Sequence, residues 1–379
     1  MRARRPWAVI SGGGTAGHVS PGLAIAEEIV ARGAHRDDVG WIGSSRGLEA
    51  RLVPEAGFEL LALPGRGIQR RLTPVNIVSI GGLLVAIVRA IVRFVRHRPS
   101  VLVALGGYAS VPGVLAAIVW RVPIVITEQN AVPSAANRLA ARFAKASAAP
   151  FPDSPLPNAT WTGNPVRPGI VAVDRATQRD DARATLDIES ERMVLLVMGG
   201  SLGARRINHA LYDALPAWRG RDDLCVYHIA GERDHDELAG RVPIEPTDAL
   251  DYRLIRYEND MASVYAASDL VLCRAGGNSV AELAVVGLPS ILIPLPGAPG
   301  DHQTANGRAL AEADAAVLVA DDMLDETRLI LEVESLLADP ARLSTMAASA
   351  ASIGRPDAPA AIVDLVESHA LQPLPGIPS

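Results

Sequence analysis

Short apolar runs alternate along the chain with longer helical stretches, and most of the runs end in a glycine-rich or polar turn. A run of four to six apolar residues predicts a buried strand, and repeated strand–turn–helix units predict a parallel sheet between helices. The predicted strands are 7–10, 39–42, 101–104, 124–126, 193–198, 225–230, 252–257, 270–273 and 291–295. This pattern predicts an α/β protein in which a strand, glycine turn and helix open each half.

The segment that follows the predicted strand 270–273 allows two interpretations of Glu282. Ser279 and Glu282 have the spacing of a capping box at a helix start, and Gly287 is placed to end that helix. Glu282 is then a capping residue. Alternatively, its carboxylate accepts hydrogen bonds from the vicinal hydroxyls of a sugar, because ligands bind at the carboxyl ends of parallel strands. The spacing alone favours the cap.

The first glycine turn has the spacing of a dinucleotide-binding site. Gly12, Gly14 and Gly17 follow the first predicted strand, so an NAD-linked enzyme is one hypothesis. That hypothesis needs an acidic residue at the end of the second strand, where the chain has Gly43-Ser44-Ser45. The turn therefore indicates a phosphate or sugar site rather than a dinucleotide site.

A basic and apolar segment interrupts an otherwise acidic chain. The 379 residues carry a net charge of −6, which argues against general nucleic-acid binding. Between Glu59 and Glu128, however, eight arginines occur and no acidic residue. Residues 77–95 have helical apolar spacing; periodicity favours a core-facing helix with solvated arginines over an amphipathic helix on a membrane. The uncharged run 72–88 is too short to span a bilayer.

Length and composition set further limits. A chain of this length fits two α/β domains. Cys225 and Cys273 lie in apolar runs, which indicates inert core thiols, and the chain shows no metal-ligand spacing. The proline-rich end, residues 372–379, is expected to fray.

Six motifs in one order resemble the MurG family of peptidoglycan glycosyltransferases. They are Ser-Gly-Gly-Gly-Thr-Ala-Gly-His-Val-Ser-Pro at 11–21, Leu-Gly-Gly-Tyr at 105–108, Glu-Gln-Asn-Ala-Val-Pro at 128–133, Gly-Asn-Pro-Val-Arg at 163–167, Gly-Gly-Ser-Leu-Gly-Ala-Arg at 199–205 and Asp-His-Gln at 301–303. Each motif alone is weak, but their combination is specific.

The resemblance implies a GT-B fold, with two doubly wound Rossmann-like domains facing across a cleft. It assigns residues 1–166 to the lipid acceptor and the membrane, 167–345 to UDP-GlcNAc, and 346–379 to a tail packed back on the first domain. The implied reaction transfers GlcNAc with inversion from UDP-GlcNAc to the 4-hydroxyl of MurNAc in lipid I. Alternatives are another GT-B transferase with a different lipid or natural-product acceptor, and a nucleotide-sugar-binding scaffold.

The resemblance also assigns roles to individual residues. His18 is the candidate base. The substrate-binding residues are Thr15, Ala16, Gly17, Asn130, Arg167, Ser201, Glu282 and Gln303. The membrane and acceptor surface comprises Arg66, Arg70, Arg71, Arg89, Arg93 and Tyr108, and the resemblance favours a membrane surface over a core-facing helix for the segment 65–98. No metal or cofactor is required, and the expected partners are UDP-GlcNAc, lipid I, the cytoplasmic face of the membrane and other cell-wall enzymes.

Overall fold

The computed structural model describes residues 5–64, 74–200, 203–241, 243–245 and 247–376, without the side chains of residues 74–80. Contacts divide the chain into two units, Met1–Arg167 with Arg355–Ser379, and Pro168–Gly354. The expected division after residue 345 would fall inside helix α14 (Pro340–Ile353). This helix packs on α11 (Gly277–Val286), so the chain leaves the second unit only after Gly354.

The first unit is a parallel sheet with helices on both faces. Its elements are β1 (Ala8–Gly12), α1 (Ala16–Ala31), η1 (Arg36–Asp38), β2 (Val39–Ser44), α2 (Glu49–Glu55), β3 (Glu59–Leu63), α3 (Pro74–Arg96), β4 (Val101–Gly106), η2 (Tyr108–Ser110), α4 (Val111–Trp120), β5 (Ile124–Thr127), α5 (Ala135–Ala140), β6 (Ala146–Ala149), β7 (Ala159–Trp161) and α15 (Ala358–His369). The strand order is β3-β2-β1-β4-β5-β6-β7, and every pair is parallel. This is the doubly wound arrangement that the pattern predicts.

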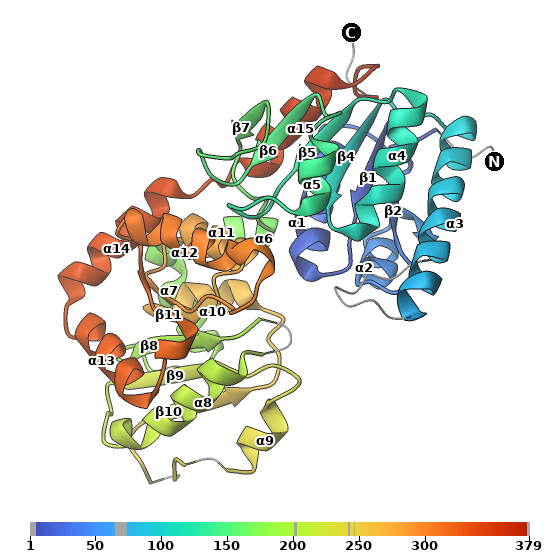
Figure 1. The fold of residues 1–379 in the computed structure, drawn as a ribbon. Helices are drawn as coiled ribbons and strands as arrows, with labels where there is room; N and C mark the ends of the chain where they lie inside the picture. The colour runs from blue at the N-terminus through green and yellow to red at the C-terminus, as the bar shows by residue number, and fades with distance from the viewer. Residues whose placement is uncertain (1–4, 65–73, 201–202, 242, 246, 377–379) are drawn as a thin grey trace. The chain divides into compact units, whose positions relative to one another are not determined.

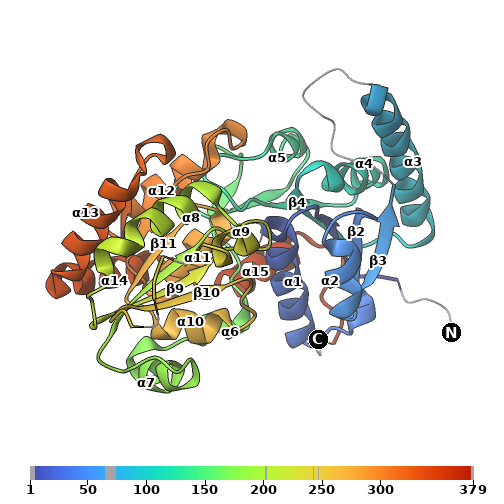
Figure 2. The ribbon, with the colours of Figure 1, turned by 90° about the horizontal axis from the view of Figure 1, so that it is seen from below.

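Neighbouring residues of the central strands enter different cores, because side chains alternate across a sheet. Ile10 belongs to the core covered by α1, α2 and α15 (Figure 1). Val9 belongs to the core covered by α3, α4 and α5 (Figure 2). The carboxyl edge of the sheet between these two layers stays available for turns.

The end of the chain is held on the first unit as far as residue 376. Trp7 Nε1 donates to the Gln372 carbonyl oxygen at 2.8 Å, and Leu371 N–H donates to the Ser100 carbonyl oxygen at 3.0 Å. Leu374 is buried in the same core as α1. The expectation of a frayed end is therefore wrong for residues 372–376, while 377–379 lie outside the described residues.

Helix α3 exposes much of its apolar surface. Ala86, Ala90 and Phe94 face the core, whereas Leu84 and Val88 are each 60% exposed. The prediction that the large aliphatic side chains of this helix face the core is thus wrong for several of them, since small residues let the helix pack closely beside α4. None of the helices within the described residues has the length and apolar content to cross a membrane.

The second unit repeats the same plan. Its elements are α6 (Pro168–Val171), α7 (Arg175–Thr185), β8 (Met193–Met198), α8 (Arg205–Ala214), η3 (Leu215–Trp218), β9 (Leu224–Ile229), α9 (His235–Ala239), β10 (Asp251–Ile255), α10 (Met261–Ala267), β11 (Leu270–Cys273), α11, β12 (Ser290–Leu292), η4 (Pro299–Asp301), α12 (His302–Glu312), β13 (Ala316–Leu318), η5 (Asp321–Met323), α13 (Glu326–Leu337) and α14. The parallel strands follow the order β10-β9-β8-β11-β12-β13.

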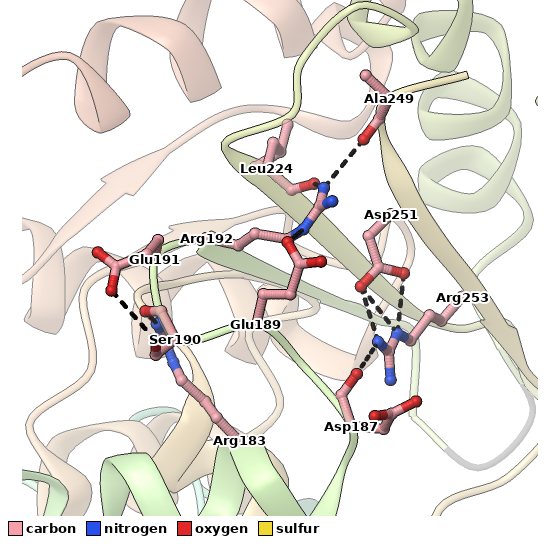
Figure 3. A network of polar contacts seen from close by, with 10 residues as sticks. All are labelled: Arg183, Asp187, Glu189, Ser190, Glu191, Arg192, Leu224, Ala249, Asp251 and Arg253. Atoms are coloured by element: carbon pink, nitrogen blue, oxygen red, sulfur yellow. Dashed lines mark hydrogen bonds and ion pairs between the residues drawn. The ribbon is translucent and has the colours of Figure 1, made fainter. Parts of the chain in front are cut away.

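Arginines link the connection between α7 and β8 to the sheet by hydrogen bonds (Figure 3). Arg253 pairs with Asp251 at 2.7 Å and also donates to the Leu186 and Asp187 carbonyl oxygens. Arg192 donates to the Leu224 and Ala249 carbonyl oxygens at 3.2 and 3.0 Å. Both guanidinium groups are committed to the backbone, so their role is to hold the fold.

Candidate functional site

The strand order of each sheet reverses beside its first strand, and the glycine turns lie at these two points. In the first unit the turns follow β1 and β4, which are neighbours. In the second unit they follow β8 and β11, also neighbours. Ligands of open α/β sheets bind at such switch points, outside the carboxyl ends of the strands. The structure thus gives each unit one candidate half-site.

Thr15 and His18 interact at the start of α1. Thr15 is the N-cap residue, but its hydroxyl makes no capping bond to the backbone. Instead Thr15 Oγ1 lies 3.2 Å from His18 Nδ1. Ala16 and Gly17, also predicted to bind substrate, form the first turn of the helix between them. The hydroxyl that would usually cap the helix therefore orients an imidazole ring.

The turn after β4 packs against this imidazole. A Cβ atom on Gly107 would lie 3.6 Å from His18 Cε1 and 3.7 Å from Nε2. Gly107 has a φ of 71°, which favours glycine on its own account. Tyr108 follows, and its ring lies 4.0 Å from the position of a Cβ on Gly14. The structure brings Thr15 and His18 into contact and places Tyr108 beside the same glycine turn.

Two buried carboxylates organise this edge, and the sequence did not predict the role of either. Glu49 is fully buried and accepts hydrogen bonds from the backbone N–H groups of Gly14 and Ser44, each at 2.7 Å. Its signal in the sequence is faint: an acidic residue in a helical first turn close behind Gly43 and Gly47.

Glu128 shapes the loop after β5 in the same way. It is 3% exposed and accepts hydrogen bonds from the N–H groups of Asn130 at 3.1 Å and Ser134 at 2.9 Å, and from Asn137 Nδ2 at 2.9 Å. The Asn130 side-chain amide also donates to Glu128 at 3.3 Å. Asn130, a predicted substrate ligand, is therefore held in place by the acidic residue two positions before it.

Glu282 lies inside α11, beyond the positions of a capping box. The helix begins at Gly277 with Gly276 as N-cap, so Ser279 and Glu282 are already in its first turns and the capping-box interpretation is wrong. The Tyr265 hydroxyl donates to Glu282 Oε2 at 2.9 Å. A partly buried carboxylate oriented by a tyrosine beside the turn after β11 suits the binding of hydroxyl groups.

Gln303 precedes Thr304 and bonds to Leu295, two residues that line a pocket of 500 Å³. Its Oε1 accepts a hydrogen bond from the Leu295 N–H group at 2.9 Å, which turns its amide N–H groups outward as donors. Leu295, Asp301, Thr304 and Asp321 line the pocket. Its volume is that of a small-molecule site. Its walls are mixed, because Asp301, Thr304 and Asp321 lie beside Pro294, Leu295 and Leu318, and such walls suit a ligand with both polar and apolar faces, as a sugar has.

A buried polar chain lies behind the turn that follows β8. Asn208 Nδ2 donates to the Ala230 carbonyl oxygen at 2.9 Å and to Asp234 at 3.0 Å. Asn208 Oδ1 therefore accepts from His228 Nε2 at 3.1 Å, and the Tyr252 hydroxyl donates to His228 Nδ1 at 2.9 Å. Burial lowers the pKa of His228 to about 3, so this ring is neutral near pH 7.

The remaining predicted residues are placed as follows. Arg66, Arg70, Arg71 and Ser201 lie outside the described residues. Arg167 is exposed where the first unit ends. Arg89 is exposed on α3, whereas Arg93 donates to both carboxylate oxygens of Glu59 at 2.8 Å. This ion pair neutralises the Arg93 charge, in contrast to the expected solvated row of arginines.

The two thiols and the acidic groups give no sign of metal binding. Cys225 and Cys273 are buried, and burial raises the pKa of each to about 12, as expected for core thiols. Within the part of the chain that the structure describes, no group of three or more His, Cys, Asp or Glu side chains is placed to hold a metal ion.

Comparison with known proteins covers both units. The glycosyltransferase family 28 N-terminal domain matches residues 8–149, and the C-terminal domain of that family matches residues 194–361. The crystal structure of Acinetobacter baumannii MurG has a TM-score of 0.76 and 28% identity, with 95% of this chain and 99% of that chain covered.

Curated relatives carry one name, UDP-N-acetylglucosamine–N-acetylmuramyl-(pentapeptide) pyrophosphoryl-undecaprenol N-acetylglucosamine transferase. The relative from Acidothermus cellulolyticus is 42% identical, with 96% of this chain and 97% of that protein covered. The relative from Nocardioides sp. is 41% identical, with 91% and 93% covered. The chain belongs to the MurG family.

Membership of the family confirms the expected GT-B fold and makes the chain a glycosyltransferase. The scaffold alternative loses its support. The glycosyltransferase of kitacinnamycin and the UDP-GlcNAc 2-epimerase from Neisseria meningitidis match at TM-scores of 0.66 and 0.65, with 18% and 15% identity. These two share the fold alone and do not bear on the acceptor.

Proposed function

We propose that the chain transfers GlcNAc from UDP-GlcNAc to the 4-hydroxyl of MurNAc in lipid I, giving lipid II and UDP. The observation that carries the proposal is 42% identity across 96% of the chain to a relative named for this transfer. The glycine turns of this chain lie at the switch points of the two sheets, where ligands of open α/β sheets bind. The protein thus acts in peptidoglycan synthesis.

The decisive experiment supplies UDP-GlcNAc and lipid I to the purified protein and follows lipid II by mass and UDP by its release. We expect both products in equal amounts, and none when lipid I is omitted. A chelator should leave the rate unchanged, because the proposal assigns no step to a metal. Donor binding without transfer to lipid I, or transfer only to another acceptor, would contradict the proposal.

Donor binding is assigned to Glu282, Gln303 and Arg167. Glu282, held by the Tyr265 hydroxyl at 2.9 Å, accepts hydrogen bonds from the ribose hydroxyls. Gln303 directs its amide N–H groups to the hydroxyls of GlcNAc. Arg167 is assigned to the diphosphate, where a cation stabilises the charge that develops as the sugar leaves. Each assignment follows the family motif and uses a chemically suitable group.

The acceptor hydroxyl is activated by His18. The oxygen of the acceptor hydroxyl forms the new bond to C1 of GlcNAc. The C1–O bond to the diphosphate breaks, and UDP departs with that electron pair. The hydroxyl proton passes to His18 Nε2. This requires Nδ1 to carry the ring proton and to donate a hydrogen bond to Thr15 Oγ1, 3.2 Å away. Thr15 Oγ1 can accept this hydrogen bond, which holds the ring in the orientation that leaves Nε2 available as a base.

The lipid end of the acceptor has an apolar pocket beside Tyr108. This pocket of 110 Å³ is lined by Leu63, Leu83, Ala86 and Val111 as well as the tyrosine. An apolar cavity of about 150 Å³ binds benzene, so this pocket suits one five-carbon isoprene unit. Since Tyr108 also adjoins the turn at Gly14, the pocket supports an acceptor that runs from the turn toward α3.

Peripheral attachment to the cytoplasmic face of the membrane completes the proposal. Leu84, Val88 and Val95 on α3 are 60%, 60% and 56% exposed, and Val119 on α4 is 56% exposed. Exposed apolar surface of this kind, flanked by Arg89, supports binding at the interface of an anionic bilayer. The nucleotide-sugar donor and the lipid acceptor can meet there.

A further inference from the structure

The carboxylate of Glu49 is built into the first glycine turn. Its Oε2 accepts from Gly14 N–H and its Oε1 accepts from Ser44 N–H, each at 2.7 Å, and the side chain is fully buried. One side chain thus joins the end of β2 to the turn after β1. Hydrogen bonds to a charged group are about twice as strong as neutral ones, so this connection is stiff.

Three glycines leave the space that this carboxylate fills. A Cβ atom on Gly13, Gly43 or Gly47 would lie 2.2, 2.6 or 2.1 Å from a side-chain atom of Glu49. Contacts this short force a displacement. At Gly43 and Gly47 the φ is not positive, so the carboxylate itself is the reason for glycine. The sequence is arranged around Glu49 from several sides.

Gly14, which Glu49 holds, lies close to the proposed base in the chain. Gly14 directly precedes Thr15, whose hydroxyl contacts His18 Nδ1. Displacing Gly14 would therefore move the start of α1 and the Thr15–His18 pair. Because Glu49 already occupies the Gly14 N–H group, this part of the turn is not free to bind a phosphate.

We propose that Glu49 is a positioning residue of the transfer reaction, which keeps Thr15 and His18 in their catalytic arrangement. The inference rests on the proposed function. The same contact bears on the first glycine turn. The Gly14 N–H group donates to the Glu49 carboxylate and is therefore not a donor to the diphosphate of a substrate.

Glu49→Gln keeps the shape but faces an amide N–H group toward one of the two backbone donors. We expect kcat to fall by about tenfold or more, with the KM for UDP-GlcNAc within about twofold, because donor residues lie elsewhere. Hydrogen exchange of residues 12–18 should accelerate. Glu55→Gln, on the same helix but exposed, is the matched control and should change neither quantity.

A double-mutant cycle tests the contact without depending on one variant. Gly47→Ala should displace the carboxylate and lower kcat, whereas the same change in a Glu49→Ala background should have little further effect. Additive losses would overturn the proposal. So would faster exchange at residues 12–18 with unchanged turnover, since Glu49 would then stabilise a turn that the reaction does not use.

The two proposals fail in different ways. A wild-type protein that makes no lipid II overturns the proposed function, whatever Glu49 does. A wild-type protein that makes lipid II while Glu49→Gln and Gly47→Ala retain full kcat overturns the positioning role alone. If Glu49→Gln does not fold, the Gly47→Ala variant decides the question.

Discussion

At the scale of single residues, His18→Ala tests the proposed base. We expect kcat to fall by roughly 10²–10⁴-fold while the KM for UDP-GlcNAc stays nearly constant, and the acidic limb of the pH–rate curve to disappear. Thr15→Val should also lower kcat, because the contact at 3.2 Å that orients the His18 ring is lost. A lower rate with the acidic limb intact would assign His18 to substrate positioning.

Replacement of Glu282 should affect the donor more than the fold. Because Glu282 lies beyond the positions of a capping box, Glu282→Ala should raise the KM for UDP-GlcNAc by about tenfold or more, with only a small change in melting temperature. Tyr265→Phe removes the hydroxyl that orients Glu282 and should give a smaller rise. Unchanged donor affinity in both variants would show that the carboxylate is structural.

The buried His228 should make the free energy of unfolding of the second unit depend on pH. Burial lowers its pKa from 6.5 to about 3, so between these values the unfolded chain binds one proton more than the folded protein. The free energy of unfolding therefore falls as the pH falls from 6.5 toward 3, by about 1.4 kcal/mol per pH unit. Above pH 6.5 this residue contributes no pH dependence.

The measurement is urea unfolding of wild type and His228→Gln at pH 7.5 and pH 5. The variant should be less stable at pH 7.5, because it disturbs the bonds to Asn208 and Tyr252. Its loss between the two pH values should be smaller than that of wild type by about 2 kcal/mol. Equal losses of unfolding free energy in wild type and variant would mean that His228 does not cause the pH dependence between pH 7.5 and pH 5.

At the scale of elements, α3 is the predicted contact with the membrane. Reversing Arg89 and Arg96 to Glu should weaken co-sedimentation with anionic vesicles, by about 1 kcal/mol for each positive charge lost near the surface, and less at high salt. Arg93 is left intact because it pairs with Glu59. Charge reversal of Arg308 and Arg342, both exposed on the second unit, is the control. Equal binding by both variants would remove α3 from the membrane contact.

Strands with long apolar runs were predictable from the sequence, and short or partly exposed strands were not. The bounds of β8 and β11 agree with the predicted runs 193–198 and 270–273. Strands β3, β6, β7 and β13 were missed: β6, β7 and β13 have only three or four residues, and β3 begins at Glu59 and is only partly buried. On α3 the periodicity was clear, but which apolar side faces the core depended on packing against α4.

The candidate site was predictable where motifs mark it and hidden where backbone atoms form it. His18 and Thr15 stand in a recognisable glycine turn, and the structure brings them together. Glu49 was missed because its hydrogen-bond partners are backbone N–H groups, which leave no pattern in the sequence. The capping prediction for Glu282 failed because the same four-residue spacing also occurs within a helix.

At the scale of the whole molecule, the first unit depends on both ends of the chain. Ile362, Val363 and Val366 of α15 are fully buried in the core that α1 also enters. A chain that stops after Gly354 should therefore expose this core, lower the melting temperature of the first unit and lose turnover. Differential scanning calorimetry checks the result, and an unchanged first unit would contradict it.

The return of the chain to its first unit has a consequence for how the protein is made. On the ribosome, residues 1–167 emerge first, yet their core lacks α15 until the last part of the chain has been synthesised. The segment 168–354 is complete earlier than the unit that surrounds it in sequence. Contrary to the usual N-terminal-first order, we therefore expect the half of the enzyme encoded in the middle to fold first, while the half that carries His18 waits for the synthesis of α15.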